Sequence, residues 1–306
     1  MSAGSPSFGF LTFLAVVIVI VAGVGTGLLY EYNHPKSPAT RVTVQVGDNV
    51  TVDYIGLFGS GPEQGRVFDT SIESVALDSA IYPKSLDFSL RNASGYTPLA
   101  VHVGPNTPSS GYNISGTNYV GVVPGFWQGL LGLPVNQTRW VTVPAAEGYG
   151  PLNPGCLVTE PLVRTIPVVV TVTPATFATS YPGTTAASGA TFRDPTYSWV
   201  DQVLSVNSSA VVIARMPYLG ETTFPYGWTI TVTNLTSQTI TLDSQLTLAS
   251  VGAVRGVNPA VTICSSTSFI IWSVDLASGT FTENYNREVV GQTLIFVVTV
   301  RSILPP

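Results

Sequence analysis

Charged side chains are scarce in this chain of 306 residues: Asp, Glu, Lys and Arg together make up 9% of it, and the net charge is −5. Because no run of basic residues is present, the chain offers no surface suited to a polyanion, and nucleic acid is not expected as a partner. Thr, Ser, Val, Gly and Pro are abundant instead. This composition is typical of a β-rich protein whose solubility depends on hydroxyl groups.

Cysteine and histidine are also rare, with two residues of each. His34 and His102 are isolated, and no C-x-x-C pair or His–Cys cluster exists, so neither a metal site nor a cofactor is expected. The chain also lacks G-x-S-x-G, a candidate triad histidine and a phosphate-binding loop, so nothing supports hydrolysis. Cys156 and Cys264 lie far apart in sequence. They would form a disulfide in an oxidising space, and two buried free thiols are the alternative.

One long apolar run lies near the N-terminus. Residues 8–30 carry no charge and are long enough to cross a hydrocarbon core of about 30 Å. The run predicts one transmembrane helix, within an anchor of residues 1–30 that a Pro-containing tether of residues 31–40 follows. A cleaved signal peptide is the alternative, although its apolar core would be shorter and would follow positive charge.

Two features of the sequence bear on the orientation in the membrane. Lys36 and Arg41 follow the apolar run and would favour a cytoplasmic C-terminal side. Six N-x-[ST] sequons favour the opposite orientation, because such acceptors are modified only in exported segments. Together with the cysteine pair they predict a single-pass membrane glycoprotein with the bulk of the chain extracytoplasmic. The sequons begin at Asn49, Asn92, Asn113, Asn136, Asn207 and Asn234.

Residues 121–150 are the stretch around which the rest of the chain is arranged. Phe126, Trp127, Leu130 and Leu131 recur at the spacing of one apolar helix face, and a Gly–Pro-containing segment ends that helix. Residues 140–143 then predict a short strand, and residues 147–150 predict a turn. Upstream, residues 42–53 alternate between valine and polar residues, which predicts strands with one buried face.

The order of these motifs resembles the FKBP-type peptidyl-prolyl cis-trans isomerases. V-G-D-N-V-T-V-D-Y-I-G at residues 46–56 is similar to the family's opening strand, and R-V-F-D-T-S at residues 66–71 is similar to its G-x-x-F-D-[ST]-S segment. P-L-A-V-H-V-G at residues 98–104 resembles the strand before the helix. Residues 293–303, T-L-I-F-V-V-T-V-R-S-I, are the best match to the closing strand.

The closing strand is postponed in this chain, which implies an inserted domain. N-Y-N-R-E-V-V-G-Q at residues 284–292 resembles the run that follows the flap insertion of SlyD-like members. The resemblance therefore implies an α+β architecture: an antiparallel sheet wrapped on a short helix over residues 41–150 and 291–306, with an all-β domain inserted over residues 151–290. Residues 199–232 run loosely parallel to residues 272–300, so a duplication is a hypothesis for the insert.

The resemblance also assigns roles to residues. Asp69 and Tyr149 would supply polar contacts during catalysis, and the Val123 backbone N–H would anchor the substrate carbonyl. Phe126 takes the place of a frequent tryptophan, as in SlyD-like members, and Leu99 takes the place of a frequent phenylalanine. The pocket for the proline ring would consist of Tyr54, Phe68, Leu99, Val122, Val123, Phe126 and Phe296.

Two functions are therefore open from the sequence. The first is a membrane-anchored isomerase and folding chaperone at the outer face of the membrane, whose partners are unfolded or proline-containing polypeptides and whose insert binds those clients. The alternative is a catalytically silent surface or envelope protein with the same fold, in which the insert serves binding or assembly.

Overall fold

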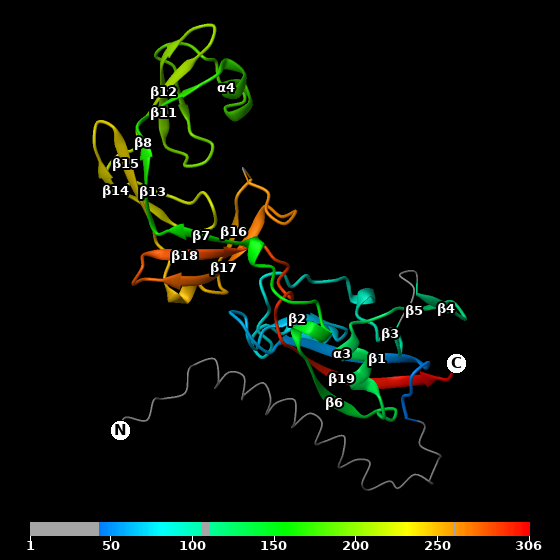
Figure 1. Cartoon of the computed structure of the whole chain (residues 1–306). Helices are drawn as coiled ribbons and strands as arrows, with labels where there is room; N and C mark the ends of the chain where they lie inside the picture. Colours follow the sequence, from blue (N-terminus) through cyan, green and yellow to red (C-terminus); the bar gives the residue numbers. More distant parts are fainter. Residues whose placement is uncertain (1–42, 106–110, 260) are drawn as a thin grey trace, which may run out of the picture. The chain divides into compact units, whose positions relative to one another are not determined.

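A computed structural model describes residues 43–105, 111–259 and 261–306. The predicted anchor and tether lie outside these ranges, and within them no helix is long and apolar enough to span a bilayer. The chain divides into two compact units (Figure 1). Of the described residues, the first unit holds those from Thr43 to Asn153 and again from Arg287 to Pro306, and the second unit holds those within Pro154–Asn286. The bounds of the second unit lie a few residues inside those predicted for the insert.

An antiparallel sheet forms the centre of the first unit. The C-terminal strand lies inside this sheet, where it pairs with the first strand on one side and with β6 on the other. The first strand also pairs with β2 and β3. Segments that the second unit separates in sequence therefore share one sheet. The strands are β1 (Asn49–Phe58), β2 (Val67–Thr70), β3 (Leu99–His102), β6 (Thr138–Val143) and β19 (Leu294–Leu304).

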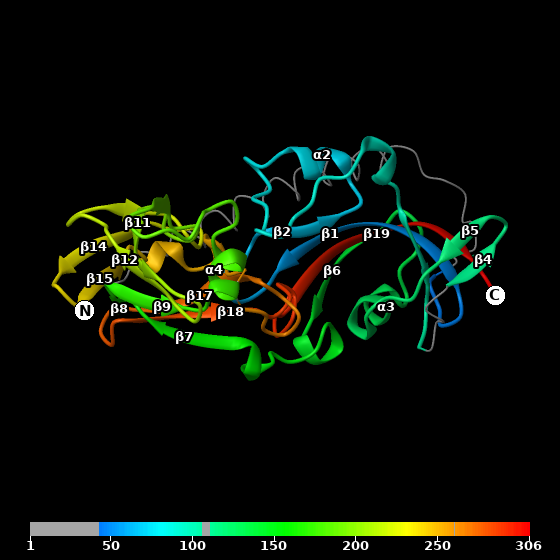
Figure 2. The same ribbon diagram turned by 90° about the horizontal axis from the view of Figure 1, so that it is seen from above.

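Short helices cover the two faces of this sheet. α3 (Pro124–Leu130) lies along one face, and α2 (Glu73–Leu77) lies on the other (Figure 2). Two separate cores result, because the side chains of β1 and β19 alternate between the faces. The larger core, on the α3 side, contains the aromatic residues of the candidate site.

Two glycines bring α3 close to the sheet. A Cβ atom added at Gly125 would lie 2.7 Å from the nearest side-chain atom of Val143, and one at Gly129 would lie 2.2 Å from that of Val141. A larger residue at either position would push the helix away from β6. The absence of side chains at these two glycines thus determines how closely α3, and Phe126 on it, approaches the strands.

Two connections of the first unit contain regular structure of their own. The connection between β2 and β3 includes α2 and a turn of 3₁₀ helix at Ala93–Gly95. The connection between β3 and α3 forms a hairpin of β4 (Tyr112–Ile114) and β5 (Thr117–Tyr119), in which the Tyr112 ring centroid lies 4.5 Å from that of His102. Residues 106–110, between β3 and this hairpin, lie outside the described residues.

The second unit consists of three four-stranded antiparallel sheets of one design. In each sheet a leading strand pairs with the last strand of a three-stranded meander. The three leading strands follow one another directly in sequence. The three meanders come after them in the reverse order, so that the meander of the last leading strand comes first. Each later sheet is therefore nested in sequence within the sheet whose leading strand precedes its own. We name each sheet after its leading strand. The β7 sheet has β7 (Leu157–Pro161), β16 (Arg255–Val257), β17 (Ser268–Asp275) and β18 (Thr280–Asn284); the β8 sheet has β8 (Val163–Pro167), β13 (Thr222–Thr223), β14 (Ile230–Leu235) and β15 (Thr239–Ser244); the β9 sheet has β9 (Val169–Val172), β10 (Thr191–Arg193), β11 (Val200–Val206) and β12 (Val211–Arg215).

Matching details show that the three sheets are structural repeats. The middle strand of each meander has a register shift after a buried aliphatic residue, at Val203, Val232 and Ile271 respectively. Each of these residues accepts a hydrogen bond at its carbonyl from a glycine N–H, donated by Gly189, Gly220 and Gly252 in the same order. The last strand of each meander pairs with its leading strand at equivalent positions. The leading-strand residues at one such position are Glu160, Ile166 and Val172, which are six residues apart in sequence. The second unit therefore consists of three structural repeats.

The repeat suggested by the sequence does not match these sheets. Its second copy ran from Trp272 to Val300, but residues 294–300 belong to β19 in the first unit. The counterpart of Trp199 is Trp228, since each lies two residues after a tyrosine and just before the middle strand of its meander. Trp272 is instead the extra residue at the register shift of β17.

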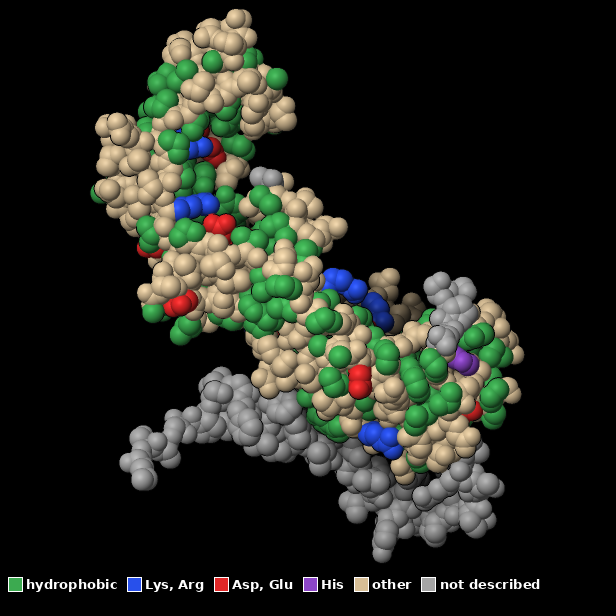
Figure 3. Space-filling view, in the orientation of Figure 1, with side chains coloured by type: hydrophobic (Ala, Val, Ile, Leu, Met, Phe, Trp, Pro, Cys, Tyr) green, Lys and Arg blue, Asp and Glu red, His purple; other side chains and the backbone are tan. Residues whose placement is uncertain are grey.

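A disulfide joins Cys156 to Cys264, which are 108 positions apart in sequence. The disulfide links the residue just before β7 to the loop that precedes β17, so it joins two segments of the β7 sheet. Strands outnumber helices throughout the described residues, as the composition predicts. In the face shown in Figure 3, charged side chains are few and scattered among polar and apolar ones.

Candidate functional site

Asp69 lies at the centre of a polar network at the edge of the first unit's sheet. The Tyr54 hydroxyl donates to Asp69 Oδ2 at 2.5 Å, and the Thr70 backbone N–H donates to Asp69 Oδ1 at 2.8 Å. Arg91 Nη2 lies 3.0 Å from the same Oδ1 and also donates to the Thr70 carbonyl. Burial, and after it the Asp69 carboxylate, raises the pKa of Tyr54. Tyr54 therefore keeps its proton and remains a donor.

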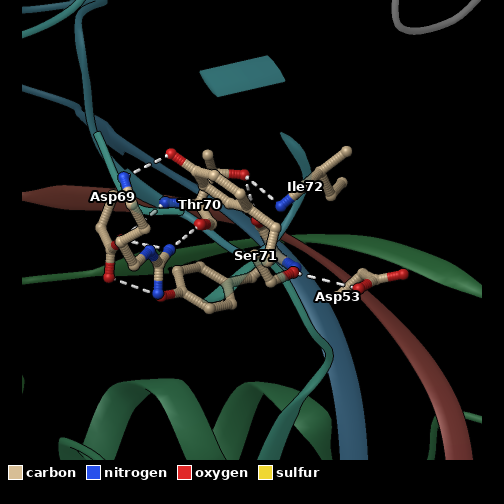
Figure 4. A network of polar contacts seen from close by, with 8 residues as sticks. Asp53, Asp69, Thr70, Ser71 and Ile72 are labelled. Atoms are coloured by element: carbon tan, nitrogen blue, oxygen red, sulfur yellow. Dashed lines mark hydrogen bonds and ion pairs between the residues drawn. The ribbon is translucent and has the colours of Figure 1, made fainter. Parts of the chain in front are cut away.

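The residues after Asp69 fasten this segment to β1, as Figure 4 shows. The Ser71 hydroxyl accepts from the Tyr54 backbone N–H at 2.9 Å and donates to Asp53 Oδ1 at 3.0 Å. The Thr70 hydroxyl donates to the Tyr54 carbonyl at 2.7 Å. These bonds satisfy the backbone of β1 where β2 ends. The Asp-Thr-Ser sequence thus orients the Asp69 carboxylate toward the Tyr54 ring.

Four aromatic rings from distant parts of the chain meet beside this network. The Phe296 ring centroid lies 4.8 Å from that of Phe126, 5.6 Å from that of Phe68 and 6.4 Å from that of Tyr54. The edge-to-face geometry of the Phe126–Phe296 and Phe68–Phe296 pairs is the favourable arrangement for aromatic rings. Tyr54, Phe126 and Phe296 are at most 7% exposed, whereas Phe68 is half-buried. The first three form a floor, and Phe68 reaches the surface.

Three aliphatic residues predicted for the pocket lie around these rings. Leu99, Val122 and Val123 are half-buried and pack against the same core. Val123 is the residue before α3, and its carbonyl accepts from the Phe126 and Trp127 N–H groups. Within the described ranges its own N–H makes no hydrogen bond. This N–H is therefore an available donor at the edge of an apolar surface.

An open hollow of about 390 Å³ adjoins the ring cluster. Phe68, Asp69 and Tyr149, three of the nine residues predicted for the site, line it; the other six lie in or against the core behind it. The remaining lining residues come from the connection after α2 and from the segment that returns from the second unit. They are Asp87, Ser89, Arg91, Arg287, Glu288 and Val289.

Tyr149 presents an exposed ring on one side of the hollow. The Arg287 guanidinium lies 5.7 Å from the centroid of this ring, within the range of a cation–π contact. Burial raises the pKa of Tyr149, and the Arg287 charge opposes that shift. The ring and the guanidinium therefore lie next to each other at the hollow.

A buried pair of carboxyl groups lies behind the hollow. Glu63 is 3% exposed and Glu288 is 8% exposed. Glu288 accepts from the Ser85 hydroxyl and the Asp87 N–H, and Glu63 accepts from the Leu86 N–H at 2.8 Å. Burial, and after it the neighbouring Glu288, raises the pKa of Glu63 to about 9. Glu63 therefore keeps its proton at neutral pH.

The sequence did not single out Arg91, Arg287 or the Glu63–Glu288 pair. Arg287 and Glu288 stand within the quoted return motif, and this position next to the closing strand was the available signal. Arg91 lies in the connection between α2 and β3, where no motif marks it. Among the described residues no group of three or more His, Cys, Asp or Glu could hold a metal ion.

Comparison with known proteins adds one relationship to this geometry. No family model matches the chain. Over 124 residues, 40% of the chain, the sequence is 30% identical to a short-type peptidyl-prolyl cis-trans isomerase of Methanocaldococcus jannaschii. The match spans 58% of that protein, so the chain covers somewhat more than half the length of this relative. The similarity is distant homology to a peptidyl-prolyl isomerase over that part of the chain.

Proposed function

We propose that the first unit is an FKBP-type peptidyl-prolyl cis-trans isomerase of the SlyD-like kind, in which the second unit is the domain inserted at the flap. The observation that carries this proposal is the meeting of Phe296 with Tyr54, Phe68 and Phe126, beside an aspartate that the Tyr54 hydroxyl contacts. The distant homology to a peptidyl-prolyl isomerase supports it.

Prolyl isomerisation needs no nucleophile, because no covalent bond is broken. Its barrier of about 18–20 kcal/mol is the amide resonance lost as the C–N bond twists. A surface that prefers the twisted amide lowers this barrier. The apolar rings would receive the proline, and they favour the twisted amide because it is less polar than the planar one. The Val123 N–H would hold a substrate carbonyl, while Asp69 and Tyr149 would supply polar contacts at the rim.

We also propose that the second unit binds unfolded clients, so that the protein acts as a folding chaperone as well as an isomerase. Three repeated sheets present several short edge strands, β10, β13 and β16, and edge strands are places where an extended polypeptide can pair. Exposed apolar side chains on the β12–β13 connection, among them Tyr218 and Leu219, supply contact area.

The location that we propose is the outer face of a membrane, with residues 8–30 as the anchor. The Cys156–Cys264 disulfide supports an oxidising space. Five sequon asparagines are exposed, whereas Asn49 is 4% exposed and its amide oxygen lies 3.0 Å from His102 Nδ1. We therefore expect glycans at some of the five and none at Asn49. Mass spectrometry of tryptic glycopeptides tests this expectation, and a glycan at Asn49 on folded protein would contradict it.

A second function is favoured by a different observation. The second unit with its three repeats holds residues 154–286, close to half of the described chain, and it contains none of the site residues. A surface or envelope binding protein that has kept the fold without turnover would also present such an array. Turnover separates the two functions directly.

The test is the cis-to-trans relaxation of an Xaa-Pro peptide, followed in the presence of the full chain purified in mild detergent. We expect acceleration by the wild type and its loss in the Asp69→Ala, Phe296→Ala double variant, with folding verified by circular dichroism. Equal rates for the two folded proteins would remove the isomerase and leave the binding protein. A variant in which a short loop replaces residues 154–286 should keep peptide turnover and lose the ability to assist refolding of a protein client.

A further inference from the structure

The hollow beside the ring cluster contains both kinds of charge, so its overall charge does not decide what it binds. Asp69, Asp87 and Glu288 contribute carboxyl groups, and Arg91 and Arg287 contribute guanidinium groups. The preference instead depends on which of these groups still has hydrogen-bonding capacity to offer.

Two of the carboxyl groups and one of the guanidinium groups are engaged within the protein. Both oxygens of Asp69 accept hydrogen bonds, from Tyr54 and from Thr70 and Arg91. Both oxygens of Glu288 accept as well, from Ser85 and from the Asp87 N–H. Arg91 is held by its ion pair with Asp69, by the Thr70 carbonyl and by the Tyr96 ring 5.0 Å away.

Arg287 differs from these groups. Its side chain is exposed, and its contact is with the face of the Tyr149 ring. Among the described residues, none accepts a hydrogen bond from its guanidinium or forms an ion pair with it. A guanidinium carries five N–H donors in a planar fork that matches a carboxylate. The Arg287 guanidinium lies over the Tyr149 ring at the hollow.

We propose that Arg287 makes the site select polypeptide segments in which an acidic side chain flanks the proline. The proposal rests on the proposed isomerase function, because it places the proline on the rings and the neighbouring residue in the hollow. The Arg287 fork would pair with the aspartate or glutamate of the substrate. Phe68 and Tyr149 connect the two places, since Phe68 belongs to the ring cluster and both residues line the hollow.

The position of Arg287 gives this selection a structural origin. The residue stands where the chain returns from the second unit, immediately before Glu288, whose buried carboxyl group fixes the segment against residues 85–87. The insertion therefore adds a recognition group to the rim of the site in addition to its own sheets.

Matched peptides test the proposal with the full chain. Two pairs are needed, Glu-Pro against Gln-Pro and Pro-Glu against Pro-Gln, each within one otherwise identical sequence. We expect kcat/KM for the glutamate peptide to exceed that for the glutamine peptide about threefold to fivefold in at least one pair, which is the range of a partly exposed ion pair. The ratio should fall toward 1 when the salt concentration is raised to 0.5 M.

Variants assign the effect to Arg287. In Arg287→Gln the ratio should fall to 1, in Arg287→Glu it should fall below 1, and in Arg287→Lys part of it should remain because charge is kept without the fork. Arg193→Gln, which removes one positive charge from the second unit, should leave the ratio at the wild-type value. The ratio is an internal measure, so a general loss of activity in one variant does not imitate a loss of preference.

The outcomes separate this proposal from the function on which it rests. Turnover of the peptides with a wild-type ratio of 1, or a ratio that survives in Arg287→Gln, would overturn the role of Arg287 and leave the isomerase in place. No turnover of any peptide would overturn the isomerase itself.

Discussion

The buried Glu63–Glu288 pair makes the stability of the first unit depend on pH in an unusual direction. Burial and the neighbouring carboxyl group raise the pKa of Glu63 from 4.5 to about 9 in the folded protein. Between these values the folded state keeps a proton that the unfolded chain has lost. The contribution of the pair is therefore fully present below about pH 4.5, and it is lost as the pH rises toward 9.

The pH dependence of the free energy of unfolding corresponds to one proton, which the folded state keeps and the unfolded chain loses. Each pH unit in this window lowers the free energy of unfolding by at most about 1.4 kcal/mol through this group. Glu63→Gln removes the titration and keeps an acceptor for the Leu86 N–H. The stability of the wild type relative to this variant should thus decline steadily from pH 5 to pH 9.

Urea denaturation of the full chain in steps of half a pH unit measures this difference. Tyrosine and tryptophan fluorescence reports on unfolding, and m-values verify that the compared transitions are equivalent. Glu73→Gln is the matched control, because Glu73 is an exposed residue in the first turn of α2. Parallel pH profiles for the wild type and Glu63→Gln would refute the proton kept by Glu63.

Three further predictions concern the fold. Removing the Cys156–Cys264 disulfide, by reductant or by Ser at both positions, should destabilise the second unit by roughly 2–4 kcal/mol and leave the first unit unchanged, as amide hydrogen exchange would show; equal loss in both units would contradict it. Deleting residues 167–172 together with residues 189–219 removes one structural repeat, the β9 sheet. We expect α4 (Pro174–Ser180) to cap the β8 sheet in this variant and the protein to unfold cooperatively in denaturant. An aggregated product would argue against equivalent sheets. Gly129→Ala should cost about 1–3 kcal/mol in denaturant titration despite the better helix propensity of alanine, because its Cβ would meet Val141, and unchanged stability would refute the close packing of α3.

The sequence revealed the sheet and the helix of the first unit because their signals are local. Period-2 alternation up to Asp53 places β1, and the spacing of Phe126 and Leu130 places α3. The meeting of Phe296 with Phe126 across the second unit was accessible by resemblance, since spacing alone cannot pair strands that are so distant. The β-rich composition predicted the class of the second unit.

The three structural repeats could not be read from the sequence for a topological reason. Each sheet takes one short strand from residues 157–172 and the remaining strands from one of three later segments in reverse order. A tandem repeat is recognised by similarity between contiguous segments. Such similarity pairs Trp199 with Trp272, whereas the structural counterpart of Trp199 is Trp228. Strand pairing defines the repeat, and strand pairing is a tertiary property.

The hollow was missed because its walls depend on loop geometry. Arg91 reaches Asp69 over a connection of irregular structure, and Arg287 reaches Tyr149 from the segment of the first unit that follows the second unit in sequence. Neither position follows from periodicity. The aspartate and the tyrosine were predicted by motif, whereas their cationic partners required the structure.

The central claim is that the rings of the first unit receive the proline of a polypeptide. Intermolecular nuclear Overhauser effects between an isotope-filtered Xaa-Pro peptide and the full chain test this claim most directly. The account predicts contacts from the proline ring protons to the Phe68 ring and to the Val123 region, with the flanking residue near Arg287. Proline contacts confined to the second unit, with none to Phe68, would contradict it.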